Sequence, residues 1–206
     1  MPKSSKTLHN ELLKKLKALD NTRKNFEIAF NASTIQIDDI SQAYAGLYLD
    51  LFTEFENLIE KLFMGLLNGD IRPNNLLVTK KVIIKPSTEI ETVLLGEKKN
   101  YLDWLPYPDN TIVRAKIYFR DGKPFTFISA IQKDKISNYH KIRNAIAHKS
   151  KKAMKEFDAI ISTSTLLPHE KTPQGYLRNI PNRATGKTQL EIISDELEAI
   201  SFTLCN

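Results

Sequence analysis

Arg143, Asn144 and His148 stand close together in the segment Arg-Asn-Ala-Ile-Ala-His, which covers residues 143–148. A histidine gains and loses a proton near neutral pH, and an arginine is a permanent cation that binds anions through a planar fork. Residues of these types at this spacing could combine proton transfer with anion binding. An arginine and a histidine five residues apart are nevertheless common by chance, and a histidine on a helix surface is usually only a solvated residue. The surrounding elements must therefore decide between the two interpretations.

The segment belongs to a stretch with helical spacing. Three apolar residues share one face of a straight helix with about 100° per residue: Tyr139, Ile142 and Ile146. Asn144, His148, His140 and Lys141 fall on the opposite side, away from this apolar stripe. Arg143 lies at the border, where its long stem can carry the guanidinium to the polar side. The spacing predicts a polar, cationic helix surface.

Small residues accompany this surface. Ala145 and Ala147 flank it without bulk, so we expect that another backbone or a second subunit can come close. Asp50 and Glu54, one turn apart in an earlier helical stretch, are candidates to orient Arg143 or His148, although ordinary surface charges are the better explanation for them.

A long helix should precede the motif. Eight apolar residues recur at intervals of four and three: Ile40, Tyr44, Leu47, Leu51, Phe55, Leu58, Leu62 and Leu66. Asp39 with Gln42 resembles a capping box, and Asn68-Gly69 suits a helix C-terminus, which predicts a helix over residues 40–68. Residues 8–30 are expected to form one or two basic helices with a break at Asp20-Asn21. Further helices are expected from residue 128 onward, over 153–161, and at the C-terminal end.

Residues 70–124 differ from the rest of the chain in composition: they contain prolines and runs of β-branched residues, and their apolar residues show no helical period. Residues 112–119, the turn dipeptide Asp121-Gly122 and residues 125–127 together predict a small β-hairpin. Trp104, Tyr101, Tyr107 and Phe125 form an aromatic group; packing on the helices is the simpler explanation for it than base stacking. We expect one mainly α domain over residues 1–206, with a β-containing insertion at about 70–125.

Composition limits the classes of protein. The chain has 206 residues, 41% of them hydrophobic and 26% charged, with a net charge of +6 that favours polyanions. The single cysteine excludes an internal disulfide, and the four scattered histidines show no metal-ligand spacing. Neither a signal peptide nor a long apolar run is visible. We expect a cytoplasmic protein without membrane association, and the sequence indicates no cofactor and no metal.

At residues 143–148 the chain resembles the HEPN (higher eukaryotes and prokaryotes nucleotide-binding) family, whose signature places a His four to six residues after an Arg, often with Asn next to the Arg. The family fold is an up-and-down helical bundle with the motif on a late helix. Residues 70–124 have no counterpart in the minimal family bundle. Toxins of this family that pair with nucleotidyltransferase antitoxins usually carry a Tyr two residues after the His. Ser150 occupies that position, which favours the broader defence-associated ribonucleases.

The resemblance implies a metal-independent endoribonuclease in which the ribose 2′-hydroxyl attacks the neighbouring phosphate. Under this interpretation His148 transfers protons, Arg143 holds the phosphate, and Asn144 orients the imidazole or contacts the phosphate. His140, Lys141 and Lys149 are the expected substrate contacts.

The resemblance also implies partners. One helix presents one such histidine, so we expect a homodimer with two motifs in one composite cleft. RNA and a regulatory or antitoxin protein are the other expected partners, in prokaryotic defence or a toxin-antitoxin stress response. Six lysines in the vicinity could attract RNA or simply form a solvated face: Lys133, Lys135, Lys141, Lys149, Lys151 and Lys152.

Two alternatives stay open. A non-catalytic HEPN-like module would bind RNA, a nucleotide or a protein partner, although such modules have lost the Arg or the His and this chain keeps both. If the chain is instead a purely structural helical dimerisation protein, His148→Ala should change local packing and no other measurable property.

Overall fold

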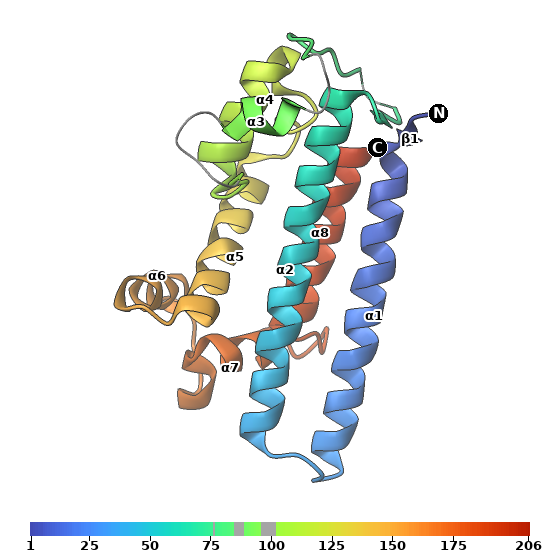
Figure 1. Cartoon of the computed structure of the whole chain (residues 1–206). Helices are drawn as coiled ribbons and strands as arrows, with labels where there is room; N and C mark the ends of the chain where they lie inside the picture. The colour runs from blue at the N-terminus through green and yellow to red at the C-terminus, as the bar shows by residue number, and fades with distance from the viewer. Residues whose placement is uncertain (76, 85–88, 96–101) are drawn as a thin grey trace. The chain divides into compact units, whose positions relative to one another are not determined.

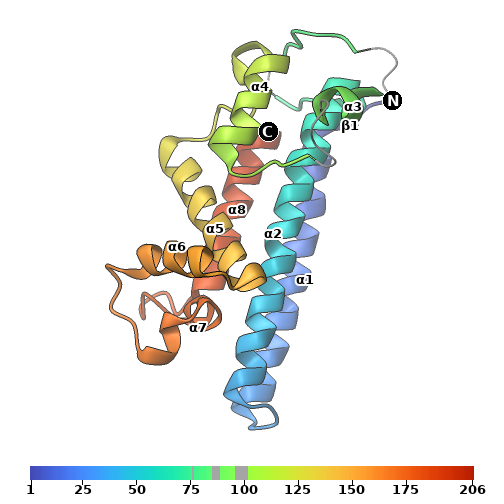
Figure 2. The same cartoon turned by 60° about the vertical axis from the view of Figure 1, so that its left-hand side comes forward.

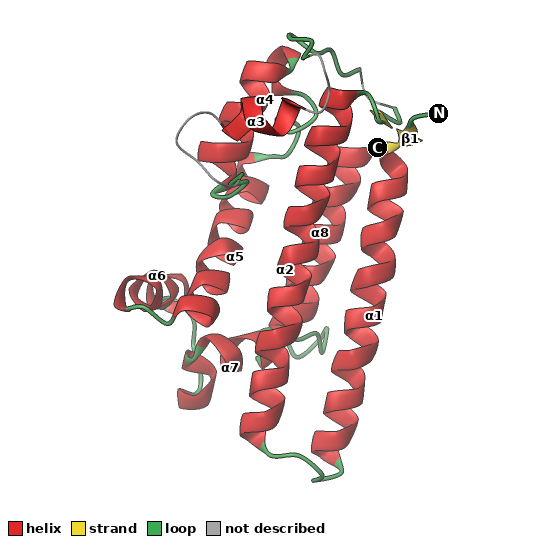
Figure 3. Cartoon of the chain, in the orientation of Figure 1, coloured by secondary structure: helices red, strands yellow, loops and turns green. Residues whose placement is uncertain are grey.

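The computed structural model describes residues 1–75, 77–84, 89–95 and 102–206. Over these residues the fold is mainly α, as the sequence predicts, and Figure 3 shows helix as the dominant element. Eight α-helices are described: α1 (Ser5–Asn31), α2 (Ile37–Asn68), α3 (Ile90–Leu95), α4 (Val113–Tyr118), α5 (Ala130–His148), α6 (Lys151–Ile161), α7 (Pro173–Arg178) and α8 (Gln189–Cys205). The two strands in this part of the chain, β1 (Lys3–Ser4) and β2 (Ile71–Arg72), pair in parallel.

The chain divides into two compact units. Unit 1 consists of Met1–Leu12, Phe55–Ser137 and Glu198–Asn206, and unit 2 consists of Leu13–Glu54 and Asn138–Leu197. Helices α1, α2, α5 and α8 contribute residues to both. The motif segment 143–148 lies entirely in unit 2, which is therefore the unit that positions it.

Helix α1 continues through Asp20-Asn21, where the sequence suggested a break. The Asp20 carboxylate accepts hydrogen bonds from Arg23, three residues on, at 2.8 and 3.0 Å, and pairs with Lys24, four residues on, at 2.6 Å. Pairs at these spacings lie on one side of a helix and stabilise it. Local ion pairing thus offsets the weak helix propensity of Asp and Asn.

Helix α2 confirms the predicted long helix, because all eight residues of its apolar stripe are buried. Gly69 follows it with φ 90°, as expected for a residue that ends a helix. The predicted start was wrong by three residues. The backbone N–H of Gln36 donates to Asp39 Oδ2 at 2.9 Å, so Asp39 is the third residue of the helix and accepts from the cap position instead of being the cap.

In unit 1 a cluster of aromatic side chains is centred on Phe63 of α2. Its ring lies 5.0 Å from the ring of Trp104 and 5.1 and 5.2 Å from those of Phe119 and Phe125. Trp104, Tyr107 and Phe125 are buried, so the packing interpretation of this group is confirmed for them; Tyr101 lies outside the described residues. These rings hold residues 102–127 onto α2 and are not available for stacking on bases.

The predicted β-hairpin at residues 112–127 is wrong. A π-helical turn over residues 107–112 leads into α4, and Asp121 and Gly122 turn the chain with φ 57° and 69° without joining two strands. The physical reason is spacing: Ile112, Ala115 and Phe119 are buried at intervals of three and four, while the β-branched Val113 and Ile117 are exposed. Burial in the core therefore favours a helix, in which apolar residues recur every three or four positions, over a strand, in which they alternate. The strand content of residues 70–125 is limited, among those described, to β2 and a bridge between Lys80 and Phe119.

In unit 2 the chain turns sharply between α5 and α6, as both views show (Figures 1 and 2). Helix α6 begins at Lys151, two residues before its predicted start, and α8 is the predicted last helix. Among the described residues, no helix is both long and apolar enough to cross a membrane.

Candidate active site

Helix α5 carries the motif at its C-terminal end. The helix closes at His148, and Lys149 leaves it in the left-handed region with φ 48°. Ser150 then caps α6, with its hydroxyl accepting from the backbone N–H of Ala153 at 3.2 Å. The motif therefore stands where two helices meet at a sharp turn, and His148 is exposed there.

The two predicted faces of this part of α5 are confirmed. Tyr139, Ile142 and Ile146 are buried, while Arg143 and Asn144 are half-buried and His148 is exposed. The inward face is held by more than apolar contact, because the buried Tyr48 hydroxyl of α2 donates to the Tyr139 carbonyl at 2.7 Å. The Tyr139 hydroxyl in turn donates to Glu196 of α8. These contacts fix the rotation of α5 and so the direction in which the motif points.

Arg143 contacts the other two candidate catalytic residues. Its Nη1 donates to Asn144 Oδ1 at 3.2 Å and lies 3.3 Å from His148 Nε2. A guanidinium has donors and no acceptor. Arg143 is therefore the donor in this contact, and Nε2 of His148 is the acceptor. Arg143 thus occupies the unshared pair of Nε2, and a substrate hydroxyl must displace this hydrogen bond before Nε2 can take a proton.

His140 belongs to the same group of side chains. Its Nε2 lies 3.3 Å from Nδ2 of Asn144, one turn later in α5. Its ring stacks on Phe52 of α2, with centroids 6.4 Å apart and planes 14° from parallel. The structure thus places four of the predicted site residues in one continuous chain of contacts that runs from His140 through Asn144 and Arg143 to His148.

The lysines expected near the motif differ in their exposure. Lys141 is half-buried, Lys149 is exposed, and Lys151 and Lys152 are exposed in the first turn of α6. Lys133 and Lys135 belong to unit 1, whereas the motif belongs to unit 2. These two lysines are therefore not included in the site. The carbonyl end of α5 favours positive charge and disfavours anions. An anion bound there would depend on Arg143 and on these lysines.

One expectation about the surroundings of the motif is corrected, and another feature of these surroundings has an ordinary explanation. Ala145 is buried within unit 2, so its small side chain serves packing inside the chain and not the approach of a second subunit; Ala147 is exposed. Glu54 pairs with Lys15 of α1 at 3.3 Å, which explains its charge without the motif. Asp50 is exposed on α2.

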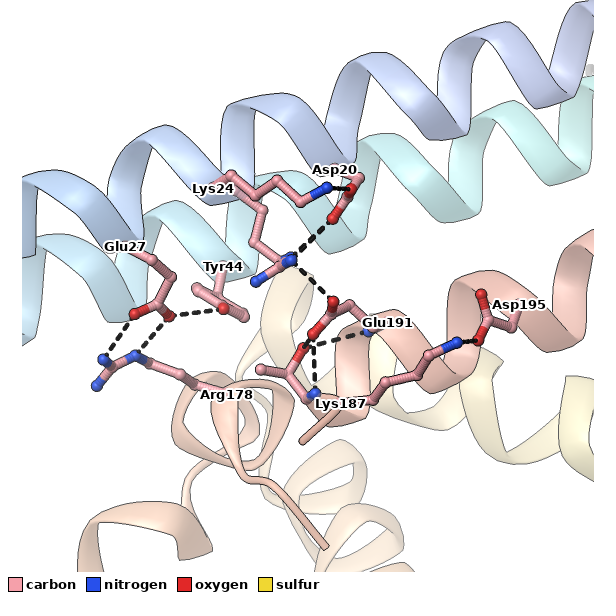
Figure 4. Close-up of polar contacts among 10 residues, drawn as sticks. Asp20, Lys24, Glu27, Tyr44, Arg178, Lys187, Glu191 and Asp195 are labelled. Atoms are coloured by element: carbon pink, nitrogen blue, oxygen red, sulfur yellow. Dashed lines mark hydrogen bonds and ion pairs between the residues drawn. The ribbon is translucent and has the colours of Figure 1, made fainter. Parts of the chain in front are cut away.

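Sequence reasoning missed a second polar group in unit 2, which Figure 4 shows. The Glu27 carboxylate of α1 accepts two hydrogen bonds from Arg178 of α7, each 3.0 Å long, and one from the Tyr44 hydroxyl at 2.7 Å. Arg23 donates to Asp20 and, at 2.8 Å, to Glu191 of α8. No short motif signals this network, because its members come from four helices that are distant in the sequence.

The charges of this network are balanced internally. Burial opposes ionisation of Glu27, but the hydrogen bonds from Arg178 and Tyr44 outweigh it and lower the pKa of the carboxyl group. Burial also raises the pKa of Tyr44 to about 12, so its hydroxyl stays protonated and keeps donating. The network ties α1, α2, α7 and α8 of unit 2 together.

A pocket of about 1540 Å³ lies beside this network in unit 2. Its lining includes Arg23, Glu27 and Arg178 together with residues 164–167 and the exposed Ile180. Arg143, Asn144 and His148 do not line it. In the described ranges, no three His, Cys, Asp or Glu side chains are arranged to hold a metal ion. The motif and the pocket are thus separate features of the same unit.

Comparisons of the chain with known protein families, with curated proteins and with solved structures found no match.

Proposed function

We propose that the chain is a metal-independent endoribonuclease of the HEPN type, with its active site at the C-terminal end of α5. The observation that carries the proposal is the contact between Arg143 Nη1 and His148 Nε2 at 3.3 Å. It puts a permanent cation beside an imidazole nitrogen, on a surface that a large substrate can reach. Phosphate binding and proton abstraction at one place are what cleavage of RNA by its own 2′-hydroxyl requires.

In the proposed reaction His148 Nε2 takes the proton of a ribose 2′-hydroxyl. The oxygen attacks the adjacent phosphorus, and the bond from phosphorus to the 5′-oxygen of the next nucleotide breaks. The leaving oxygen receives a proton, which gives a 2′,3′-cyclic phosphate and a 5′-hydroxyl. Arg143 stabilises the charge that develops on the phosphate oxygens. DNA lacks the 2′-hydroxyl and is spared.

The proton for the leaving oxygen needs a second group, and the proposal assigns it to His148 of a second copy of the chain. Each α5 then contributes one Arg143 and one His148 to a composite cleft. Lys141 and Lys149 contact the RNA backbone, where their charge strengthens binding at low salt. Gel filtration with light scattering tests this element, and a strictly monomeric active protein would contradict it.

The setting proposed for this activity is prokaryotic defence or a stress response of the toxin-antitoxin type in the cytoplasm, with a regulatory or antitoxin protein that holds the nuclease inactive. This element rests on the family resemblance of residues 143–148. Toxicity on expression in a bacterial host, abolished by His148→Ala, is the expected result, and equal growth with both proteins would contradict it.

The deciding experiment uses a labelled single-stranded RNA in EDTA with wild type, Arg143→Ala, His148→Ala and His169→Ala. His169 is an exposed histidine in the same unit outside the motif and serves as the matched control. We expect cyclic-phosphate products with wild type and His169→Ala, and a loss of roughly a hundredfold or more with each motif variant. Equal cleavage by all four proteins, or no cleavage by wild type, would refute the proposal.

The pocket supports a second candidate, a non-catalytic module of unit 2 that binds a nucleotide or a protein segment. Three exposed apolar side chains line it, namely Ile37, Leu167 and Ile180, next to the charged network. Under this alternative, Ile180→Asp would abolish binding of a partner while His148→Ala would leave it unchanged. The cleavage assay decides between the two candidates.

A further inference from the structure

The orientation of the His140 ring is more restricted than that of an ordinary surface histidine. Phe52, which is fully buried in α2, supports one face of the imidazole in a stacked arrangement with planes 14° from parallel. Asn144 approaches Nε2 of the ring with its amide nitrogen at 3.3 Å. A ring held both by stacking and by a directed hydrogen bond has a defined orientation.

The direction of the hydrogen bonds follows from Arg143. Because its guanidinium only donates, the oxygen and not the nitrogen of the Asn144 amide must face it. That orientation turns Nδ2 of Asn144 toward His140, where it can only donate. His140 Nε2 is therefore the acceptor in this contact.

The consequence for the motif concerns the amide of Asn144. The two ends of an amide have similar size, and only hydrogen-bond partners decide which end faces which neighbour. With His140 as an acceptor on one side, the amide oxygen stays toward Arg143. Without that acceptor, the amide can turn over and present its N–H₂ group to the guanidinium, which breaks the contact that holds Arg143 beside His148.

We propose that His140 is a positioning residue, which fixes the amide of Asn144 so that Arg143 is held against His148 in the orientation needed for the reaction. The inference rests on the ribonuclease function proposed for the same site. It assigns His140 a role different from direct contact with the substrate and different from proton transfer: Nε2 of His140 accepts from Asn144 and stays in that contact during the reaction.

Two replacements of His140 separate these roles. His140→Ala removes the acceptor, whereas His140→Gln supplies an amide oxygen that can accept from Asn144 Nδ2 but cannot exchange a proton near neutral pH. We expect His140→Ala to lower kcat roughly tenfold to a hundredfold with little change in KM, since misplacement of a catalytic group acts on the chemical step. His140→Gln should recover most of kcat and keep the pH profile of the wild type. His169→Gln is the matched control and should be unchanged.

A double-mutant cycle tests the route through Asn144. If His140 acts only by fixing Asn144, the double variant His140→Ala, Asn144→Ala should be no slower than Asn144→Ala alone. Nitrogen NMR of the wild type adds a readout that does not depend on cleavage, and we expect an unprotonated Nε2 on His140 near neutral pH.

Each outcome has a defined meaning. If wild type cuts RNA and His148→Ala does not, while His140→Ala keeps full kcat, the inference is overturned and the proposed function stands. If His140→Gln is as slow as His140→Ala, His140 transfers a proton or binds substrate and the positioning role is overturned. Additive losses in the cycle or a protonated Nε2 on His140 also overturn it. If wild type cuts no RNA, the proposed function fails and the inference falls with it.

Discussion

Arg143 Nη1 lies 3.3 Å from His148 Nε2, five residues along the chain, and the same nitrogen lies 3.2 Å from Asn144 Oδ1. One side chain thus holds two neighbours through one end of its fork, which leaves the remaining donors of the guanidinium for an anion. This arrangement gives a direct expectation for replacement of the arginine by the other long cation.

Arg143→Lys keeps the positive charge but loses the planar fork. A lysine ammonium cannot hold Asn144, His148 and a phosphate in the same fixed geometry. We expect kcat on a defined RNA to fall roughly tenfold or more, with the circular dichroism spectrum unchanged. Lys155→Arg, at an exposed position of α6 outside the six lysines expected near the motif, is the control and should cut as wild type does. Wild-type kcat in Arg143→Lys would show that charge alone is sufficient.

Two glycines of α2 form a matched pair for stability. A Cβ at Gly65 would lie 2.2 Å from Ile71 Cγ1, whereas a Cβ at Gly46 would meet nothing within 4 Å. Gly65→Ala must displace Ile71 and disturb the pairing of β2 with β1, so we expect a loss of about 1–3 kcal/mol. Gly46→Ala should gain up to about 1 kcal/mol from helix propensity. Urea unfolding measures both, and equal effects of the two changes would contradict the packing at Ile71.

His9 makes unit 1 sensitive to acid. Its Nδ1 lies 2.7 Å from Ser201 Oγ, and burial lowers its pKa below 6.5, with Lys6 acting in the same direction and Glu198 in the opposite one. Because the folded-state pKa is lower than the unfolded-state value, the unfolded chain binds more protons, so stability falls as the pH drops below 6.5.

The measurement is the free energy of unfolding in urea between pH 7.5 and 5.5, which are about one unit to either side of the unperturbed histidine pKa. We expect a smaller decline in His9→Asn than in wild type, since asparagine does not titrate there. An identical decline in both proteins would mean that His9 is not the group responsible.

Glu27 joins α1 to α2 and α7 in the group that Figure 4 shows, because it accepts from both Arg178 and Tyr44. Glu27→Gln removes the charge and one acceptor and leaves the partly buried Arg178 short of a partner. We expect a loss of about 1–3 kcal/mol in the free energy of unfolding. Glu11→Gln, an exposed position on the same helix, should change it by less than about 0.5 kcal/mol. A small effect at Glu27 would show that the network contributes little to stability.

Cys205 should be unreactive in the folded protein. It is fully buried at the end of α8, and burial raises the pKa of its thiol to about 12. The thiolate is the reactive form, so we expect labelling by a thiol reagent at pH 8 to be slow in the native state and rapid in denaturant. Rapid labelling of the native protein would mean that the C-terminal end of α8 opens readily.

Much of the helical framework was set by local sequence. The stripe from Ile40 to Leu66 demands a long helix because burial of one face needs residues at intervals of three and four, and Gly69 ends it because glycine adopts positive φ without strain. The same periodicity around Ile142 and Ile146 determines that Asn144 and His148 lie on the polar side of α5. These features depend on residues within a few turns of one another.

Tertiary structure decided the rest. The sequence predicted a strand over residues 112–119, and the burial of Ala115 and Phe119 in the core selected a helix instead. The network of Glu27 and Arg178 joins residues that the sequence separates by 151 positions.

The motif itself shows the same division. Its residue types and the face it occupies follow from spacing along one helix. The support of His140 by Phe52 depends on how α2 packs against α5, and the contact between Arg143 and His148 depends on the rotamers that the two side chains adopt. Contacts between distant elements and the choice of side-chain rotamer are set by packing and by hydrogen-bond partners, which no local pattern specifies.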